Sequence, residues 1–525
     1  MGKKFPTGIS KNKHQTSSIN NVSAIQGVDR VLLWVLLLAI GLVPIIVRGT
    51  VLFYYAPLFL TPLLDSGLQG DVFAYKKLIF LIILAVLALG LLTYKVANRL
   101  NEIRPFYINI PLLLIFLLTL LSCLVADPKY VSLMGAIHLH EGTLALICYY
   151  ILFFAAANLA FTDNLRKYLT CALGLVVIVN AVLAIYWFFG GNMLNNSLVR
   201  ALVVPEQLAS VVAGTLPTTF SNINYLSGFS AIALSYFLVL ALLSSDIKSR
   251  IINLAFSLLA VAMTFASMSS SGFLTIIALS PIIIILGLKY GSLKNVALTL
   301  GSFMVIAVII FIGLNNYNPA VYSETFGAIS EQYGYLTPAL PDTSQPKVLQ
   351  ADDDRKTVET MTKIVIPEPA WTAGTGRLYL WKKTLKLIEE RPFLGYGPNT
   401  LAYYFPQNDI DKVSNLGAYE TWVDKPHNMY IATAFNSGIP VLICFLVLIG
   451  LHFYKTVRRL WENSFGDATA LSAALFAAWL AFLIQYLFND STIGVSVIFW
   501  VLFGISVSLN YQLLGESKAV GVKSH

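Results

Sequence analysis

Three short motifs between residues 376 and 430 contain the side chains best suited to chemistry. They are Gly376-Arg377 followed by Trp381, the segment Arg391–Pro398 with Gly395 and Gly397, and His427-Asn428-Met429-Tyr430. Histidine is the side chain whose unperturbed pKa lies near neutral pH, so its imidazole can take up a proton there. His427 also stands where a long polar segment meets a long apolar run. It is therefore the first candidate for acid–base chemistry.

The elements that must position these motifs are predicted to be membrane-spanning helices. Hydrophobic residues make up 57% of the 525 positions and charged residues 12%, with a mean hydropathy of +0.72. A soluble fold cannot bury that much apolar surface, so lipid must surround most of the chain. The sequence predicts an all-α polytopic membrane protein with about 12 transmembrane helices, since each of twelve apolar runs is close to the ~20 residues that cross a bilayer. The runs are 31–47, 78–94, 107–125, 143–161, 168–189, 225–244, 251–267, 273–288, 296–314, 430–451, 469–488 and 493–514.

The distribution of basic residues predicts the orientation of these spans. With both termini in the cytoplasm, the cytoplasmic segments hold 19 of the 35 Lys and Arg residues, whereas the short outside loops hold 5. Cytoplasmic loops of membrane proteins carry an excess of basic residues. The formal net charge of +8 thus reflects topology and not binding to nucleic acid.

The predicted spans divide the chain unevenly. Residues 1–30 and 515–525 are expected to be cytoplasmic tails, 31–314 to hold nine spans, 315–429 to form a large extracytoplasmic loop, and 430–514 to hold three spans. The first run lacks a small-residue cleavage site, so we expect a retained span and not a signal peptide. The four cysteines all fall inside predicted spans, which leaves no extracytoplasmic disulfide. They are Cys123, Cys148, Cys171 and Cys444.

The large loop has two different halves. Residues 315–370 are rich in Pro, Asp, Ser and Thr, which predicts irregular structure. In 378–390, the apolar side chains Leu378, Trp381, Leu385 and Ile388 recur at the spacing of one helical face. This pattern predicts an amphipathic helix at the membrane interface, with Arg377 at its N-terminal edge.

By these boundaries the spans contain no Asp, Glu, Lys or Arg. Ion-coupled carriers commonly place ionisable residues inside the membrane to carry the coupling. Their absence argues against a proton-driven transporter.

The ordered set of motifs resembles the O-antigen ligase family, which includes related O-antigen polymerases and protein O-oligosaccharyltransferases. The resemblance rests on Gly-Arg-x3-Trp from Gly376, Pro-x2-Gly-x-Gly from Pro392, and His-Asn-x-Tyr from His427, followed by Gly438-Ile439. These motifs cover roughly residues 374–440. The layout of many spans with one large outer loop before the last spans is similar over nearly the whole chain.

The resemblance implies glycan transfer on the outer face of a bacterial cytoplasmic membrane. The donor is expected to be a glycan linked to a polyprenyl pyrophosphate, and the acceptor a hydroxyl on a glycan, lipid or protein. His427 then acts as general base on the acceptor hydroxyl. Arg377 stabilises the departing pyrophosphate, because a guanidinium offers paired donors to phosphate oxygens. The resemblance implies transfer without a metal or other cofactor.

Further residues are candidates for substrate binding. They are Arg200, Arg391, Gly395, Gly397, Asn428 and Tyr430. Where the family often has Ser-Arg-Gly, this chain reads Ser270-Ser271-Gly272, so a second arginine is missing there. Arg200, in the outer loop 190–224, is the candidate replacement.

Each assignment has a structural alternative. His427 can be an interface histidine bonded to nearby backbone, and Arg377 can extend from an interfacial helix toward water. Arg391 can be a solvated charge at a helix end and Arg200 an ordinary loop charge. Trp381 and Tyr430 suit interface packing better than catalysis.

His138-Leu139-His140-Glu141 is a weak candidate for a metal site. Two histidines and a glutamate offer ligands, but no third histidine stands in a comparable place. We expect this segment to line the site without a metal.

Three other functions fit parts of the pattern. A polymerase needs the same base and phosphate contacts as a ligase, so the sequence does not separate the two. A lipid-glycan flippase predicts polar residues inside the bundle and two comparable halves, and neither is evident. A membrane scaffold leaves the Arg377 and His427 motifs unexplained.

Overall fold

The computed structural model describes most of the chain. The described residues are 10–54, 67–98, 103–104, 107–160, 164–205, 215–326, 367, 376–416, 422–462 and 466–522. Most of the segment 315–370 lies outside these residues, so its irregular state stays a prediction.

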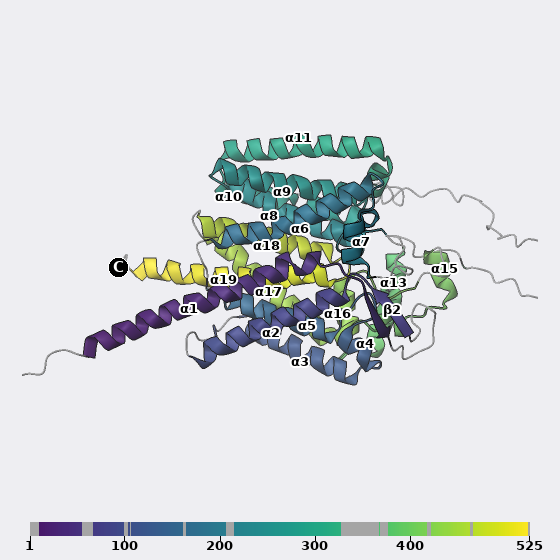
Figure 1. Ribbon diagram of the computed structural model, residues 1–525, viewed down its shortest axis with the longest axis horizontal. Coiled ribbons are helices and arrows are strands. Elements are labelled where there is room, and N and C mark those ends of the chain that lie inside the picture. The colour runs from purple at the N-terminus through teal and green to yellow at the C-terminus, as the bar shows by residue number, and fades with distance from the viewer. Residues whose placement is uncertain are drawn as a thin grey trace, which may run out of the picture.

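Ten helices are long and apolar enough to cross a membrane, among the described residues. They lie roughly parallel to one another in a bundle (Figure 1). This arrangement confirms the all-α polytopic membrane class. The ten are α1 (Ser10–Gly41), α2 (Tyr75–Ala97), α6 (Leu165–Phe188), α8 (Ile223–Leu243), α9 (Ile247–Ala266), α10 (Ser270–Tyr290), α11 (Leu293–Tyr317), α17 (Ile439–Glu462), α18 (Asp467–Gln485) and α19 (Ile493–Val522).

Two further apolar helices are shorter. α3 (Asn109–Val125) has 17 residues and α5 (Thr143–Ala157) has 15. The predicted run 143–161 ends early as a helix because the chain leaves helical geometry at Asn158. Every predicted apolar run thus coincides with a helix, while the number of twelve spans stays a prediction.

The tenth predicted run, 430–451, is divided in the structure. α16 (Met429–Ser437) ends at Gly438, whose φ of +89° does not continue a helix, and α17 starts at the next residue. Hydropathy did not reveal the break, because both pieces are apolar. The break sets α16 apart from the long helix, beside the large loop.

The remaining elements are short. They are η1 (Val43–Ile45), β1 (Thr50–Tyr54), β2 (Gly67–Asp71), α4 (Lys129–Met134), η2 (Met193–Asn195), α7 (Ser197–Val203), α13 (Arg377–Glu390), α14 (Leu401–Tyr404) and α15 (Ile410–Leu416). β1 and β2 form an antiparallel pair in which Thr50 is opposite Asp71. No sequence pattern predicted these two strands.

α13 confirms a helix in the large loop but corrects its buried face. Tyr379, Leu380 and Ile388 are buried in a small core with residues of α14 and α16. Leu378 and Leu385, predicted to lie on the apolar face with Ile388, are 39% and 48% exposed. The helix therefore packs its main apolar face on protein, because Tyr379 and Leu380 supply a broader face than the spacing from Leu378 suggested.

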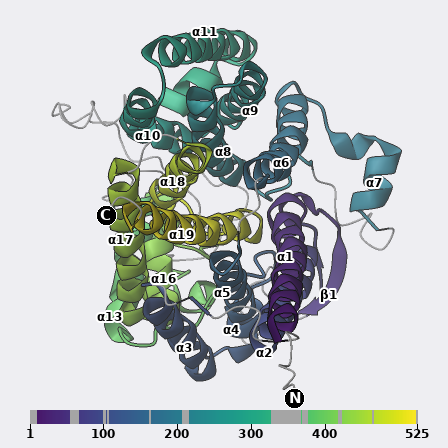
Figure 2. The ribbon, with the colours of Figure 1, turned by 90° about the vertical axis from the view of Figure 1, so that its left-hand side faces the viewer.

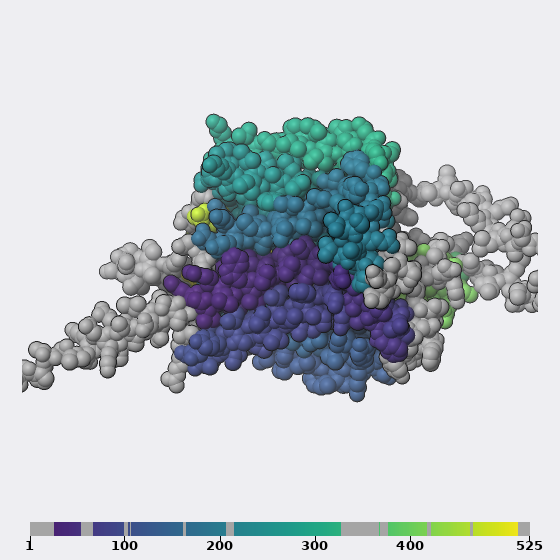
Figure 3. All heavy atoms as spheres, in the orientation of Figure 1, coloured from purple at the N-terminus to yellow at the C-terminus, as the bar shows by residue number. Residues whose placement is uncertain are grey.

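The central helices of the bundle are α8, α18 and α19. The apolar windows of α8 and α19 are 100% buried by protein, whereas that of α11 is 22% buried. α11 lies at the margin in Figure 2, and in Figure 3 successive parts of the chain form closely packed bands of colour along one face. Exposed apolar side chains such as Val305 and Ile309 cover such outer helices. They suit contact with lipid, the environment that the composition predicts.

The two ends of the bundle differ. α13, α15 and the β1–β2 pair gather at one end, hereafter the loop end, while the start of α1 and the end of α19 lie at the other (Figure 1). This placement agrees with an even number of crossings and both termini on one side of the membrane. The compartment that each side faces stays a prediction.

Candidate active site

His427 lies at the loop end, immediately before α16. Its backbone has φ of +53°, a left-handed conformation that side chains other than glycine adopt uncommonly. The next residue, Asn428, caps the helix, since its Oδ1 accepts hydrogen bonds from the backbone N–H groups of Tyr430 and Ile431. The cap and the left-handed turn fix the direction in which the histidine side chain leaves the helix start.

The imidazole of His427 is paired with a buried carboxylate. Its Nδ1 lies 2.6 Å from Oδ2 of Asp490, in the segment between α18 and α19. The Asp490 side chain is 3% exposed, whereas that of His427 is 43% exposed. When Nδ1–H donates to the carboxylate, Nε2 is left as the acceptor of a neutral ring. This is the tautomer required of a general base.

The electrostatic environment favours charge on both partners. Burial opposes the imidazolium, but the Asp490 carboxylate outweighs it and raises the pKa of His427 above its ordinary value. Burial likewise opposes the carboxylate, but His427 and Lys425 hold the pKa of Asp490 below its ordinary value. The pair can therefore accept and keep a proton on the imidazole.

Arg377 approaches the same pair from α13. It is the first residue of the helix and follows Gly376, which has φ of +80°. Burial holds the pKa of Arg377 below its ordinary value, although Asp490 opposes this effect. The charge of Arg377 also disfavours the imidazolium form of His427. The Nε of Arg377 is buried without a hydrogen-bond partner among the described residues. The guanidinium thus has an N–H donor near the histidine that the described residues do not use.

α13 is tied to the histidine segment by Trp381. Its Nε1 donates a hydrogen bond of 2.9 Å to the carbonyl of Pro426. Tyr430 is tied down in a similar way, since its hydroxyl donates to the carbonyl of Leu483 at 2.9 Å. Trp381 and Tyr430 therefore position the motif, and a substrate contact for Tyr430 or Asn428 stays a prediction.

Other polar groups surround the pair. Lys425 Nζ donates to the carbonyl of Ser491 at 2.9 Å, and Ser491 Oγ donates to Glu141 Oε2 at 2.6 Å. Tyr149 donates to the other oxygen of Glu141 at 2.8 Å. Burial raises the pKa of Glu141 and of Asp424. The segment His138–Glu141 thus contributes to the site through Glu141.

Within the part of the chain that the structure describes, no group of three or more His, Cys, Asp or Glu residues could hold a metal ion.

Arg200 is not brought to this site. It lies exposed on α7, and Figure 2 places α7 at the edge of the bundle, far from α13 and α16. Ser271, where the second arginine was expected, lies closer. Its Oγ accepts hydrogen bonds from Gln485 at 3.1 Å and Asn489 at 3.4 Å, and Asn489 precedes Asp490. The position of the missing arginine is therefore next to the site but uncharged.

Arg391 directly follows the last residue of α13 and is exposed. Its guanidinium lies over the rings of Tyr396 and Tyr404, with centroids 4.6 and 5.7 Å away. No contact joins it to His427 or Arg377 in the described residues. These ring contacts account for its position, and a phosphate contact stays a prediction.

Gly395 and Gly397 pack against the protein itself. Both have positive φ, and a side chain at Gly395 would collide with backbone atoms of Phe435 and Asn436 in α16. The neighbouring N–H groups of Tyr396 and Gly397 donate to the carbonyls of those same two residues. The glycine motif therefore docks the turn after α13 on α16, and a direct role in binding substrate stays a prediction.

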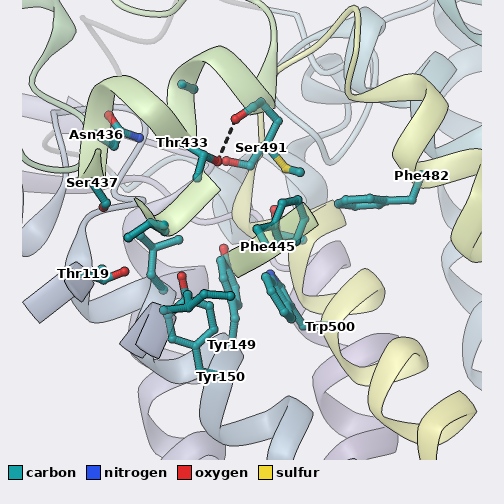
Figure 4. A pocket seen from close by; sticks show the side chains of 16 residues that line it. Thr119, Tyr149, Tyr150, Thr433, Asn436, Ser437, Phe445, Phe482, Ser491 and Trp500 are labelled. Carbon is teal, nitrogen blue, oxygen red and sulfur yellow. Dashed lines mark hydrogen bonds between the residues drawn. The ribbon is translucent and has the colours of Figure 1, made fainter. Parts of the chain in front are cut away.

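A cavity lies inside the bundle beneath α16. Aromatic rings of Tyr149, Phe445 and Trp500 face it together with the hydroxyls of Thr433 and Ser491 (Figure 4). This mixture of rings and hydroxyls suits a ligand with both apolar faces and polar groups. Ser491 places the cavity next to Asp490.

Asp490 is not among the site residues predicted from the sequence. One signal was present, because Asp490 directly follows the predicted span 469–488 and that span was predicted to end on the same side as His427. Nothing local distinguishes it from other loop carboxylates. Its pairing with a residue 63 positions away depends on how α18 packs beside α16.

The fold and the site together define an all-α polytopic membrane protein with a carboxylate-paired histidine and an arginine at one end of its bundle. Residues 255–446 match the family model described as O-Antigen ligase. The matched residues include Arg377 and His427, and over them the chain is similar to the O-antigen ligase family, as the three motifs predicted. No curated protein matches the chain. The family supports a membrane enzyme of the glycan-transferring class, ligase or polymerase, acting on a lipid-linked glycan.

Proposed function

We propose that this protein transfers a glycan from a polyprenyl pyrophosphate to an acceptor hydroxyl at the loop end of the bundle. The observation that carries the proposal is the 2.6 Å contact between His427 Nδ1 and the buried Asp490 carboxylate. Beside it is Arg377, whose buried Nε has no hydrogen-bond partner among the described residues. A half-exposed histidine held by a carboxylate is arranged as a general base, and a donor-rich cation beside it is arranged for an anion.

The proposed step moves one proton and one glycosyl group. Nε2 of His427 takes the proton of the acceptor hydroxyl as its oxygen attacks the anomeric carbon. The bond between that carbon and the pyrophosphate oxygen breaks, and the polyprenyl pyrophosphate leaves with the bonding electrons. Asp490 stabilises the imidazolium that forms, as a buried carboxylate does for the histidine of hydrolase triads.

Arg377 acts on the leaving group in this proposal. Negative charge grows on the pyrophosphate oxygen as the glycosidic bond breaks, and a fixed guanidinium lowers the energy of that charge. The partial burial of Arg377 strengthens the interaction, because water screens it less. The polyprenyl chain would lie along the lipid-facing helices.

The test compares variants of the full-length protein in proteoliposomes with lipid-linked glycan donor and acceptor. We expect His427→Ala to lower the transfer rate about 10²- to 10⁴-fold, the usual contribution of a general base. Arg377→Ala should lower it comparably, and Arg377→Lys should recover only part, because an ammonium lacks the paired donors. The matched control is Lys386→Ala, an exposed cation on the same helix, which should transfer at the wild-type rate.

Wild-type transfer by both folded alanine variants would contradict this mechanism. The same assay separates the ligase from the polymerase. A ligase moves the finished glycan to a different acceptor, so its loss leaves full-length lipid-linked glycan. A polymerase extends the lipid-linked chain, so its loss leaves only short chains.

A further inference from the structure

Two buried lysines lie near the segment that follows Asp490. Lys77 belongs to the first turn of α2 and is 3% exposed, and Lys425 precedes His427 by two residues and is 7% exposed. Both line one small cavity. His138, whose side chain is 56% exposed, lines it as well, so the cavity is open to the loop end.

Each ammonium has hydrogen-bond donors that the described residues do not use. Lys77 Nζ donates to the carbonyl of Thr219 at 2.5 Å, and Lys425 Nζ donates to the carbonyl of Ser491 at 2.9 Å. An ammonium carries three N–H donors. In the described part of the chain, neither lysine forms an ion pair with a carboxylate. Carboxylates do lie within electrostatic reach, Asp71 of Lys77, and Glu141, Asp424 and Asp490 of Lys425. The N–H donors that both ammonium groups leave unused face one cavity, and such donors favour an anionic ligand there.

The start of α19 faces the same cavity. Ile493 and Gly494 line it, and the first intrahelical hydrogen bonds of α19 come from the N–H groups of Val495 and Ser496. The N–H groups of the two preceding residues therefore have no acceptor within the helix. The positive end of a long helix adds to the attraction of the lysines for an anion.

These cations also lie near the position where the O-antigen ligase family often has a second arginine and this chain has Ser271. Ser271 bonds to Asn489, and the chain continues from Asn489 through Asp490 to Ser491, which binds Lys425. A positive charge is therefore present one short segment away from the uncharged Ser271. It comes from α2 and from the histidine segment, two elements that the expected motif does not include.

We propose that Lys77 and Lys425, with the start of α19, bind a phosphate group of a diphosphate. The identification of that diphosphate with the polyprenyl-linked donor rests on the proposed function, whereas the anion site itself does not. The lysines replace Arg200 as the second cationic contact, and Arg377 supplies the first. Because they neutralise a charge present both before and after transfer, they hold the donor in place.

Inorganic pyrophosphate is the probe for this site. Binding to the purified full-length protein in detergent is measured by calorimetry. We expect Lys77→Gln and Lys425→Gln each to weaken binding about 10- to 100-fold, the loss of a hydrogen bond to a charged group. The matched control is Lys76→Gln, the neighbouring cation on α2, which does not line the cavity and should bind as the wild type does. Glutamine variants that keep the wild-type melting profile and bind pyrophosphate equally well would overturn the proposal.

A second measurement needs no substitution. Pyridoxal 5′-phosphate, a phosphate-bearing aldehyde, is added to the wild-type protein and trapped on amines with borohydride. We expect peptide mapping to find it on Lys77 or Lys425, and excess pyrophosphate to suppress that labelling but not labelling of Lys76. Labelling that pyrophosphate leaves unchanged would contradict the site. If pyrophosphate binding depends on the two lysines but the wild-type protein transfers no glycan, the proposed function alone is overturned. If the protein transfers glycan but pyrophosphate binding does not depend on the lysines, this inference alone is overturned.

Discussion

His427 and Asp490 act as a unit whose two members come from distant parts of the chain. The carboxylate fixes the tautomer of the imidazole and raises the pKa of His427 above its ordinary value despite burial. A general base must be neutral before it can take a proton. The rate should therefore rise as the pH increases through this raised pKa.

Asp490→Asn tests the pairing. Loss of the carboxylate removes the stabilisation of the imidazolium, so the pKa of His427 falls and the acidic limb of the pH–rate profile moves to lower pH. The maximal rate should drop about 10²-fold or more, because the base loses its orientation and its charge partner. The measurement is kcat/KM as a function of pH. An unchanged acidic limb would show that Asp490 does not control the histidine.

Asp409→Asn is the matched control for that profile. Asp409 is also a carboxylate of the large loop, but it forms an ion pair with Lys383 on α13. Its removal should leave the acidic limb in place.

Two glycine-containing turns join α13, α16 and α17 into one support for the histidine. Gly438 separates α16 from α17, and Gly395 lets the chain after α13 pass close to the end of α16. The N–H of Ile439 donates to the carbonyl of Pro392 at 2.7 Å, which ties the two turns to each other. The direction of the histidine therefore depends on backbone contacts between the motifs.

Gly395→Ala should destabilise this support. Its φ of +64° is unfavourable for alanine, and the added Cβ would meet backbone atoms of Phe435 and Asn436. We expect a loss of about 1 kcal/mol or more in stability, seen as a lower melting temperature in detergent.

The matched control is Gly301→Ala, within α11 and with open space around the new Cβ. It should melt at the wild-type temperature or slightly higher, since alanine favours helix. Equal melting of the Gly395 variant and the wild type would contradict the role of this turn.

The molecule as a whole is a bundle with all of the candidate site at one end. Buried helices form its centre, and outer helices such as α11 present apolar side chains outward. The site therefore has access to polar substrate from the loop end and to a lipid chain along the sides. If the lipid-linked donor is presented outside the cytoplasm, as proposed, the loop end must face out of the cytoplasm.

Thiol labelling tests that orientation. In a variant without the four native cysteines, Glu389→Cys on α13 should react with a membrane-impermeant maleimide in intact cells. Glu462→Cys, at the far end of α17, should react only after permeabilisation. Both glutamates are exposed, so access to the compartment decides the outcome. The reverse pattern would place the candidate site in the cytoplasm.

Much of the architecture was predictable because membrane helices are defined by local composition. A run of apolar residues must be helical in lipid, where backbone groups can only bond within the segment. All twelve apolar runs coincide with helices for this reason. The division of the run 430–451 into α16 and α17 has a local cause that hydropathy does not detect, the positive φ of Gly438.

The sequence by itself determined the membrane class, the family motifs and the two residues Arg377 and His427. Only the tertiary structure decided their partners. Asp490, Glu141 and Lys77 come from segments far from the motifs, and Arg200 proved remote from them. The reason is that charge pairing depends on distance in space, and that distance follows from how α2, α16, α18 and α19 pack. A motif records which groups are present, whereas packing decides which charges meet.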